Sequence, residues 1–127
     1  MKIIETKSAP APVGPYSQAI EVSPKKFLFC SGQIALDPNS GSMVGESVSA
    51  QAEQVMKNIS AVLSAAGLTY KNIVKSTIFL LTMDDFAAVN TIYDKALDGH
   101  KPARSTVAVK SLPKEAKVEI EVIACAD

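Results

Sequence analysis

The 127-residue sequence has few of the residues on which common catalytic and metal sites depend. It contains one histidine and two cysteines, whereas a zinc site needs three or four close-set ligands. It has no GxSxG nucleophile elbow, no GxxxxGK(S/T) phosphate loop and no GxGxxG dinucleotide motif. The lone histidine, His100 in the stretch GHKP, is expected to be a solvated loop residue rather than a catalyst. The sequence therefore excludes catalysis by paired histidines and predicts no metal site.

Long hydrophobic runs are also absent. No stretch approaches the ~18–20 consecutive apolar residues that a membrane-spanning helix needs. The first residues, MKIIETKSAPAP, lack the apolar segment of a signal peptide, so we expect a cytoplasmic protein without export. Cys30 and Cys125 end the apolar runs FLFC and VIAC, which favours buried thiols over a disulfide.

Neither sign of charge is in excess. The 13 basic and 13 acidic side chains sum to a net charge of zero. Nucleic-acid-binding proteins usually carry a basic surplus, because Lys and Arg neutralise phosphates, so the balance makes a nucleic-acid partner improbable. The apolar content of 47% before glycine is counted is somewhat high, and it favours oligomerisation as a way to bury the surplus.

The hydrophobic spacing predicts two amphipathic helices. The first covers residues 49–66, where apolar side chains recur at steps of three, one and three. Gly67 is predicted to be its left-handed C-terminal cap, with Leu68 as the accompanying hydrophobic contact. The second helix is predicted to open at residues 82–85, which resemble a capping box, and to end at Gly99.

The remaining apolar segments predict strands and hence a fold class. Four strands are predicted, at 27–30, 73–81, 104–109 and 117–124. Two weaker candidates lie near 3–6 and 16–22. Residues 110–116, with Pro113, are predicted to join the last two strands as a hairpin. Length and element order predict one α+β domain over residues 1–127, a mostly antiparallel sheet with two helices packed on one face. The other face would be free to bury the apolar surplus.

Several polar residues lie at positions suited to a catalytic or binding site, and each also has a simpler structural explanation. Asn90 lies on the apolar face of the second helix, where it either pairs with backbone or serves a site. Arg104 opens a strand, and its planar guanidinium either is solvated or holds a carboxylate through two hydrogen bonds. Glu119 and Glu121 share a strand face, about 6.5–7 Å apart, where solvent exposure is the simpler explanation. Residues 31–33 form either a plain turn or a close approach of backbone to a ligand.

Four motifs in these same places resemble the RidA (YjgF) family of imine deaminases. They run in order over nearly the whole chain and include the spacing of Asn90 and Tyr93 in the second helix. The motifs are GPYSQA (14–19), FCSGQIALDP (29–38), KPARSTV (101–107) and LPKEAKVEIEV (112–122). The resemblance implies a chorismate-mutase-like α+β fold and a homotrimer, with three sites in clefts between subunits.

The resemblance also implies an activity and the residues that carry it. The activity is hydrolysis of 2-iminobutanoate and 2-iminopropanoate, released by pyridoxal-phosphate enzymes, to 2-oxo acids and ammonia, with no cofactor. Carried over by position, Arg104 would bind the substrate's carboxylate and Glu119 would hold or activate the attacking water. The residues that would shape and polarise the pocket are Tyr16, Ser31, Gly32 and Asn90.

One position departs from the family's pattern. Many members carry cysteine where this chain has Thr106. We expect the backbone N–H of Thr106 to bind the substrate, because imine hydrolysis needs no thiol nucleophile. Glu121 matches no catalytic position and is expected to be structural.

Two other functions remain as alternatives. One is RNA cleavage or translational inhibition, against which the zero net charge and the lone histidine weigh. The other is a non-catalytic trimer that binds small carboxylates or acts as a chaperone-like holdase.

Overall fold

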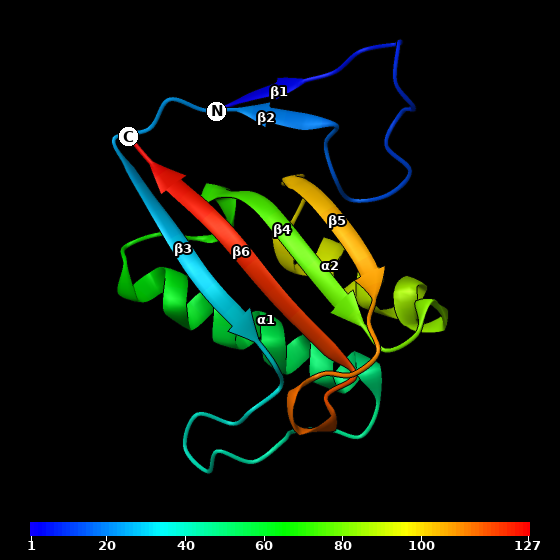
Figure 1. The fold of residues 1–127 in the computed structure, drawn as a ribbon. Coiled ribbons are helices and arrows are strands. Elements are labelled where there is room, and N and C mark those ends of the chain that lie inside the picture. Colours follow the sequence, from blue (N-terminus) through cyan, green and yellow to red (C-terminus); the bar gives the residue numbers. More distant parts are fainter.

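The computed structural model describes residues 1–127 as six β-strands and two α-helices, joined by loops and short 3-10 turns. The centre of the fold is a four-stranded sheet (Figure 1). Its strands, in spatial order, are β3 (Lys26–Gln33), β6 (Val118–Ala126), β4 (Ile73–Leu80) and β5 (Ala103–Ala108). β6 is antiparallel to both of its neighbours, whereas β4 and β5 run parallel. A separate antiparallel pair consists of β1 (Lys2–Ile4) and β2 (Ala19–Glu21).

The predicted hairpin between the last two strands is wrong. Residues 110–116 do lead from β5 to β6, but β4 lies between these strands in the sheet. The chain passes from β4 to β5 through a helix, and such a crossover returns the next strand parallel and beside the first. The other side of β4 is then available to β6, which also pairs with β3. The strand and turn patterns were visible in the sequence, but the order of strands in the sheet was not.

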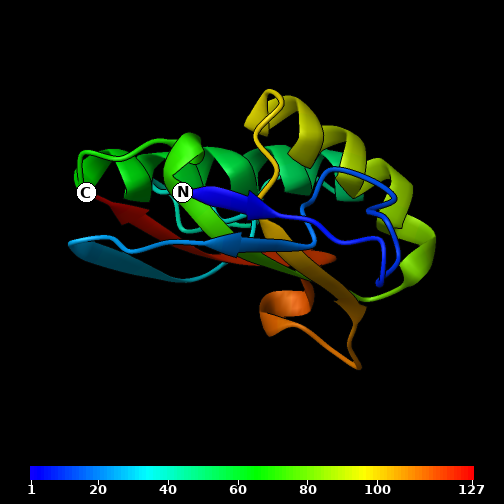
Figure 2. The same ribbon diagram turned by 90° about the horizontal axis from the view of Figure 1, so that it is seen from above.

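Two helices, α1 (Val48–Ala65) and α2 (Phe86–Leu97), cover one face of the sheet, as the sequence predicted. Figure 2 shows both on the same side, whereas the short 3-10 turn at Pro113–Glu115 lies on the opposite side. α1 ends as expected: Gly67 has φ +73°, and the N–H of Leu68 donates to the carbonyl of Leu63 at 2.9 Å. Neither helix combines the length and the apolar character needed to cross a membrane.

The start of α2 differs from the predicted capping box. The Thr82 hydroxyl accepts a hydrogen bond from the N–H of Asp84 at 3.2 Å and so caps a 3-10 turn over Met83–Asp85. The α-helix itself begins at Phe86 without a side-chain cap. The tighter 3-10 turn takes up the residues that the sequence placed in the first helical turn.

The hydrophobic core lies between the helices and the sheet. It contains 17 buried side chains, of which the largest include Tyr93, Ile59, Leu63, Ile78 and Ile120. We call the other side of the sheet the open face.

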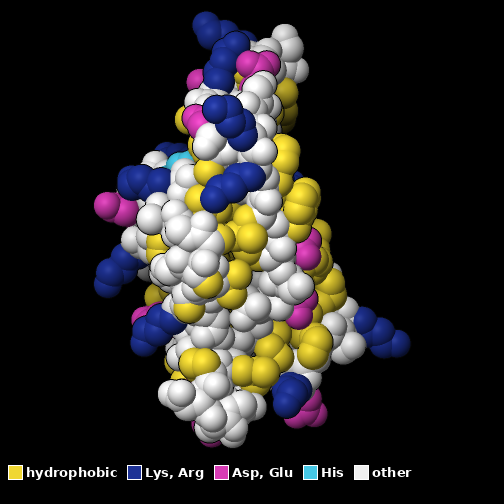
Figure 3. Space-filling model, turned by 90° about the vertical axis from the view of Figure 1, so that its left-hand side faces the viewer, with side chains coloured by type: hydrophobic (Ala, Val, Ile, Leu, Met, Phe, Trp, Pro, Cys, Tyr) yellow, Lys and Arg dark blue, Asp and Glu magenta, His cyan; other side chains and the backbone are white.

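The open face carries apolar surface of its own. Phe29 is 72% exposed and Phe27 is 50% exposed, and Val107 is exposed on β5. Figure 3 shows hydrophobic side chains gathered along its right-hand edge, where the open face is seen in profile. The apolar surplus predicted for the free side of the sheet is present there.

Candidate functional site

Arg104 is the only arginine in the chain, and it projects from the start of β5 toward α2. Its Nη1 donates a hydrogen bond of 2.6 Å to Oδ1 of Asn90. Its guanidinium carbon lies 5.3 Å from the ring centre of Tyr93, 5.4 Å from that of Tyr16 and 5.7 Å from that of Phe86. These distances are those of cation–π contacts. Three aromatic rings and one amide therefore surround the guanidinium.

The spacing of α2 supplies three of these four neighbours. Phe86, Asn90 and Tyr93 are four and then three residues apart, so all three face the same way. The hydroxyl of Tyr93 donates to Oγ of Ser76 at 2.8 Å, and Ser76 is the β4 partner of Arg104. Burial raises the pKa of Tyr93 to about 12. Tyr93 thus stays neutral and anchors this wall of the site to the sheet.

The fourth neighbour, Tyr16, comes from the loop before β2. This loop runs beside the start of β5, because the N–H of Ser17 donates to the carbonyl of Pro102 at 3.0 Å. Gly14 has φ +126°, and a Cβ there would lie 3.6 Å from Nη2 of Arg104. Glycine is therefore suited to this close, left-handed turn. The tertiary structure brings the motifs at 14–19 and 101–107 together.

The guanidinium of Arg104 forms no ion pair, and the carboxylate of Asp94 acts on it only from beyond ion-pair distance. Burial lowers its pKa from the usual value, and the one ion pair in the structure joins Lys2 to Glu21. Only one of the five N–H groups of an arginine is engaged in a hydrogen bond here, with the Asn90 amide. The remaining donors can bind an anion, and the planar fork matches a carboxylate.

Thr106 lies on the same side of β5 as Arg104, two residues further along. It pairs with Ile78 of β4, as Arg104 pairs with Ser76, and Ile78 and Ser76 both face the core. The Oγ1 of Thr106 is buried and has no hydrogen-bond partner. The strand therefore presents a cation and an unpaired hydroxyl side by side.

Glu119 lies on the opposite side of the sheet. It pairs with Phe79 of β4, and both side chains belong to the open face, where Glu119 is half-buried. A Cβ on Gly32 would lie 2.9 Å from both Cδ and Oε2 of Glu119, so a side chain at position 32 would displace the carboxylate. Gly32 and the exposed Ser31 form the irregular end of β3.

One chain thus gathers the site residues expected from the sequence into two separate groups. The first group lies on the helix side at the β5 edge and consists of Tyr16, Asn90, Arg104 and Thr106. The second lies on the open face near the β3 edge and consists of Ser31, Gly32 and Glu119. Glu121 shares the open face but is exposed and pairs with Thr77.

Three residues of the Arg104 surroundings were missed at the sequence level as members of a site. Phe86 falls within the predicted second helix without an assigned role, whereas Tyr93 and Gly14 enter only through the family resemblance. The signal for the first two was their helical spacing from Asn90, because residues three and four apart share a face. Nothing in the sequence placed Gly14 beside Arg104.

The remaining chemical groups of the chain lie elsewhere. His100 is half-buried rather than solvated, and its Nε2 lies 2.7 Å from the carbonyl oxygen of Ile73; the loop folds back onto β4. Nowhere in the structure do three His, Cys, Asp or Glu side chains come close enough to hold a metal ion.

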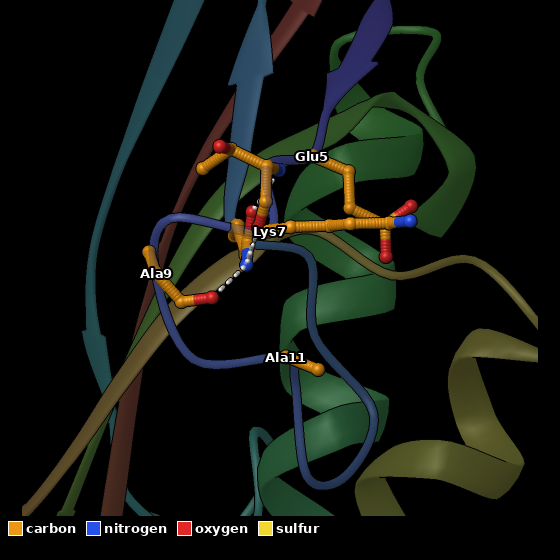
Figure 4. A pocket seen from close by; sticks show the side chains of 6 residues that line it. Glu5, Lys7, Ala9 and Ala11 are labelled. Atoms are coloured by element: carbon orange, nitrogen blue, oxygen red, sulfur yellow. Dashed lines mark hydrogen bonds between the residues drawn. The ribbon is translucent and has the colours of Figure 1, made fainter.

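The largest cavity, of about 530 Å³, lies under the loop after β1 (Figure 4). Its lining residues are Glu5, Thr6, Lys7, Ala9, Ala11 and Gln18. Nε2 of Gln18 donates to the carbonyls of Thr6 at 3.1 Å, Ala9 at 3.3 Å and Pro10 at 2.8 Å. The amide of Gln18 is thus engaged in holding the loop, and none of the expected site residues lines this cavity.

Comparisons with known proteins give a consistent result. The family model described as Endoribonuclease L-PSP matches residues 6–126. The chain is 54% identical to the RutC family protein slr0709 of Synechocystis, over 98% of this chain and 95% of that protein. It is 46% identical to the 2-iminobutanoate/2-iminopropanoate deaminase of Mus musculus, over 97% of this chain and 90% of that protein. The crystal structure of E. coli TdcF with bound serine is similar over the full length of both chains, with a TM-score of 0.76 and 40% identity.

Proposed function

The chain belongs to the RidA (YjgF) family, and on that basis we propose that it hydrolyses 2-imino acids to 2-oxo acids and ammonia in the cytoplasm. The proposed substrates are 2-iminobutanoate and 2-iminopropanoate. The observation that carries the proposal is the half-buried Arg104 guanidinium, which is held by an amide and aromatic rings and has no acidic partner. Such a cation suits a small anion with a planar carboxylate. The relative named for this activity in Mus musculus supports the same substrate class.

In the proposed reaction, Arg104 holds the carboxylate and so orients the adjacent imine carbon. Glu119 takes a proton from water as the water oxygen bonds to that carbon, and it returns this proton to the imine nitrogen. The resulting carbinolamine collapses when Glu119 carries the proton of its hydroxyl to the nitrogen, which leaves as ammonia. One imine and one water yield one 2-oxo acid and one ammonia. Tyr16 and Asn90 hold the guanidinium in place, and Gly32 leaves room for the carboxylate of Glu119.

The proposal requires more than one copy of the chain at each site. Side chains alternate across a strand, so Arg104 and Glu119 of one chain lie on opposite faces of the sheet. We propose a homotrimer in which each cleft takes Arg104 from one subunit and Glu119 from its neighbour. A cyclic head-to-tail arrangement supplies three equivalent sites. It also buries the exposed Phe27 and Phe29 of the open face.

The test is an ammonia-release assay in which an amino-acid oxidase generates the imine. We expect Arg104→Ala and Glu119→Ala each to reduce the enzyme-dependent rate by a factor of about 100 or more, as loss of a charged binding or acid–base group does. Lys110→Ala and Glu53→Gln are matched controls, because they change exposed charges outside both groups, and Glu53 lies on α1, away from the open face. Full activity in Arg104→Ala would refute the proposed mechanism.

A second candidate function is binding of small carboxylates without catalysis. It is favoured by the serine bound to TdcF, since serine is also a small carboxylate. Arg104-dependent binding of 2-oxobutanoate without accelerated ammonia release would establish this function in place of the first. Cleavage of RNA, which the family description suggests, would instead require Arg104-dependent degradation of RNA by a ribonuclease-free preparation.

A further inference from the structure

A single buried side-chain polar atom in the chain lacks a hydrogen-bond partner, and it lies next to Arg104. This atom is Oγ1 of Thr106. Native structures pair nearly all buried polar atoms, because an unpaired one destabilises the fold. The exception therefore calls for a physical explanation.

The position of Thr106 points to a ligand as the missing partner. Thr106 and Arg104 are two residues apart on β5, about 6.5–7 Å from each other, and project to the same side of the sheet. The β4 residue opposite Thr106 is Ile78, whose side chain offers no donor or acceptor. The nearest charged side chain along this side of β5 is thus Arg104, which itself has no anionic partner.

The shape of threonine allows its hydroxyl to change surroundings at little cost. The hydroxyl and the methyl group of threonine are similar in size, and in a strand more than one χ1 rotamer is accessible. A 120° turn about the Cα–Cβ bond can therefore bring the methyl group into the buried place while Oγ1 moves to the position that Hβ held, so the buried space stays filled. The buried hydroxyl is consistent with a resting position that a ligand can displace.

We propose that the Thr106 hydroxyl is a second donor for the carboxylate of the substrate, unpaired in the free protein and rotated toward the anion when one binds to Arg104. The inference rests on the proposed function for the class of ligand and adds a residue that determines affinity for it. A hydrogen bond from a hydroxyl to a carboxylate is stronger than one between neutral groups. The bound anion thus supplies the partner that Oγ1 lacks. This role belongs to the side chain and adds to the backbone contact expected from the family's pattern.

The test compares binding and stability in two Thr106 variants. Thr106→Val keeps the shape and removes the hydroxyl, whereas Thr106→Ser keeps the hydroxyl. We expect Thr106→Val to raise the Tm of the free protein by a few degrees and to weaken binding of 2-oxobutanoate about tenfold or more in calorimetry. Thr106→Ser should bind 2-oxobutanoate with a Kd within about threefold of that of the natural chain, because it keeps the hydroxyl. Thr77→Val, on the open face of β4, is the matched control and should leave binding unchanged.

A measurement on the unmodified protein tests the rotation directly. Three-bond couplings to the Thr106 methyl carbon report χ1 by NMR, and they should change when 2-oxobutanoate is added. Unchanged affinity in Thr106→Val, an unchanged or lower Tm in that variant, or a χ1 that stays constant on binding would each overturn the inference.

Failure of the inference can be told apart from failure of the proposed function. The binding assay uses a stable 2-oxo acid and needs no catalysis. If the natural chain releases no ammonia from imines while Thr106→Val weakens 2-oxobutanoate binding, the role of Thr106 stands and the deaminase proposal falls. If the natural chain hydrolyses imines and Thr106→Val binds 2-oxobutanoate normally, the deaminase proposal stands and the role of Thr106 falls.

Discussion

Arg104 and Glu119 project from opposite faces of one four-stranded sheet. Arg104 pairs with Ser76, which faces the helices, and Glu119 pairs with Phe79, which faces the open side. The proposed reaction needs both side chains at one imine, because the first binds its carboxylate and the second supplies its water. The register therefore leads to a prediction about subunits rather than about single residues.

Mixed oligomers of two inactive variants should recover activity. A site can be intact where an Arg104→Ala subunit supplies Glu119 and a Glu119→Ala subunit supplies Arg104. With random assembly from equal amounts, about one site in four meets this condition in a cyclic oligomer with sites between neighbours. Ammonia release by the co-expressed variants should therefore reach about a quarter of the natural rate. Each variant alone is the control, and activity no higher than theirs would contradict a shared site.

Asn90→Asp should weaken substrate binding. An aspartate at this position would place a carboxylate on the Arg104 Nη1 that now donates to the amide at 2.6 Å. It would compete with the carboxylate of the substrate through a charge-assisted hydrogen bond. We expect KM to rise about tenfold or more with a smaller change in kcat. Thr91→Asp, which adds the same charge on an exposed part of α2, should leave KM near its original value.

Gly32→Ala should lower kcat while KM changes little. Gly32 does not have a positive φ, so alanine is tolerated by the backbone and the effect comes from contact with Glu119. The added Cβ would lie 2.9 Å from Oε2 and displace the carboxylate that we propose to activate water. Steady-state kinetics should show a loss of about tenfold or more in kcat, the scale of a misplaced general base.

The Gly32 effect should also depend on the length of the side chain at position 119. In a Glu119→Asp background, the shorter side chain leaves room for the added methyl group. Gly32→Ala should therefore lower kcat by a smaller factor than it does in the natural chain. Independent effects of the two substitutions would argue against contact between them.

Tyr93→Phe should make stability less sensitive to alkaline pH. The pKa of Tyr93 is about 12 in the fold and about 10 in an unfolded chain. The unfolded state loses this proton first, so the stabilisation is complete below about pH 10 and is lost as the pH rises toward 12. Near pH 8 the variant should be less stable by about 1 kcal/mol, because Ser76 loses its donor.

Urea unfolding at a fixed protein concentration measures this difference. The stability advantage of the natural chain over Tyr93→Phe should shrink between about pH 8 and about pH 11. A constant difference across this range would mean that Tyr93 ionises alike in the folded and unfolded chains.

Much of the fold could be predicted from local patterns. The helices over 48–65 and 86–97 and the alternation of Val118, Ile120 and Val122 follow from the periods of an α-helix and a strand. The C-terminal cap at Gly67 follows from the conformational freedom of glycine. These features depend on residues close together in the chain, which is why their spacing reveals them.

The candidate site was only partly predictable. The motifs supplied Arg104, Glu119 and the surrounding polar residues as expectations, but they did not show that these divide between two faces of a sheet. That division depends on how β4 pairs with β5 on one side and with β6 on the other. The unpaired hydroxyl of Thr106 depends on the same packing, since sequence spacing says nothing about which atoms a buried oxygen meets.

The sequence by itself determined the helices, most strands, the apolar surplus and the balance of charge that weighs against a nucleic-acid partner. Each of these is a property of composition or of residues within a few positions of one another. Only the tertiary structure decided that β5 lies parallel to β4, that Tyr16 and Asn90 enclose Arg104, and that Glu119 lies on the far face. The physical reason is that strand order and register arise from contacts between distant segments, and a shift of one residue in register moves every side chain to the other face.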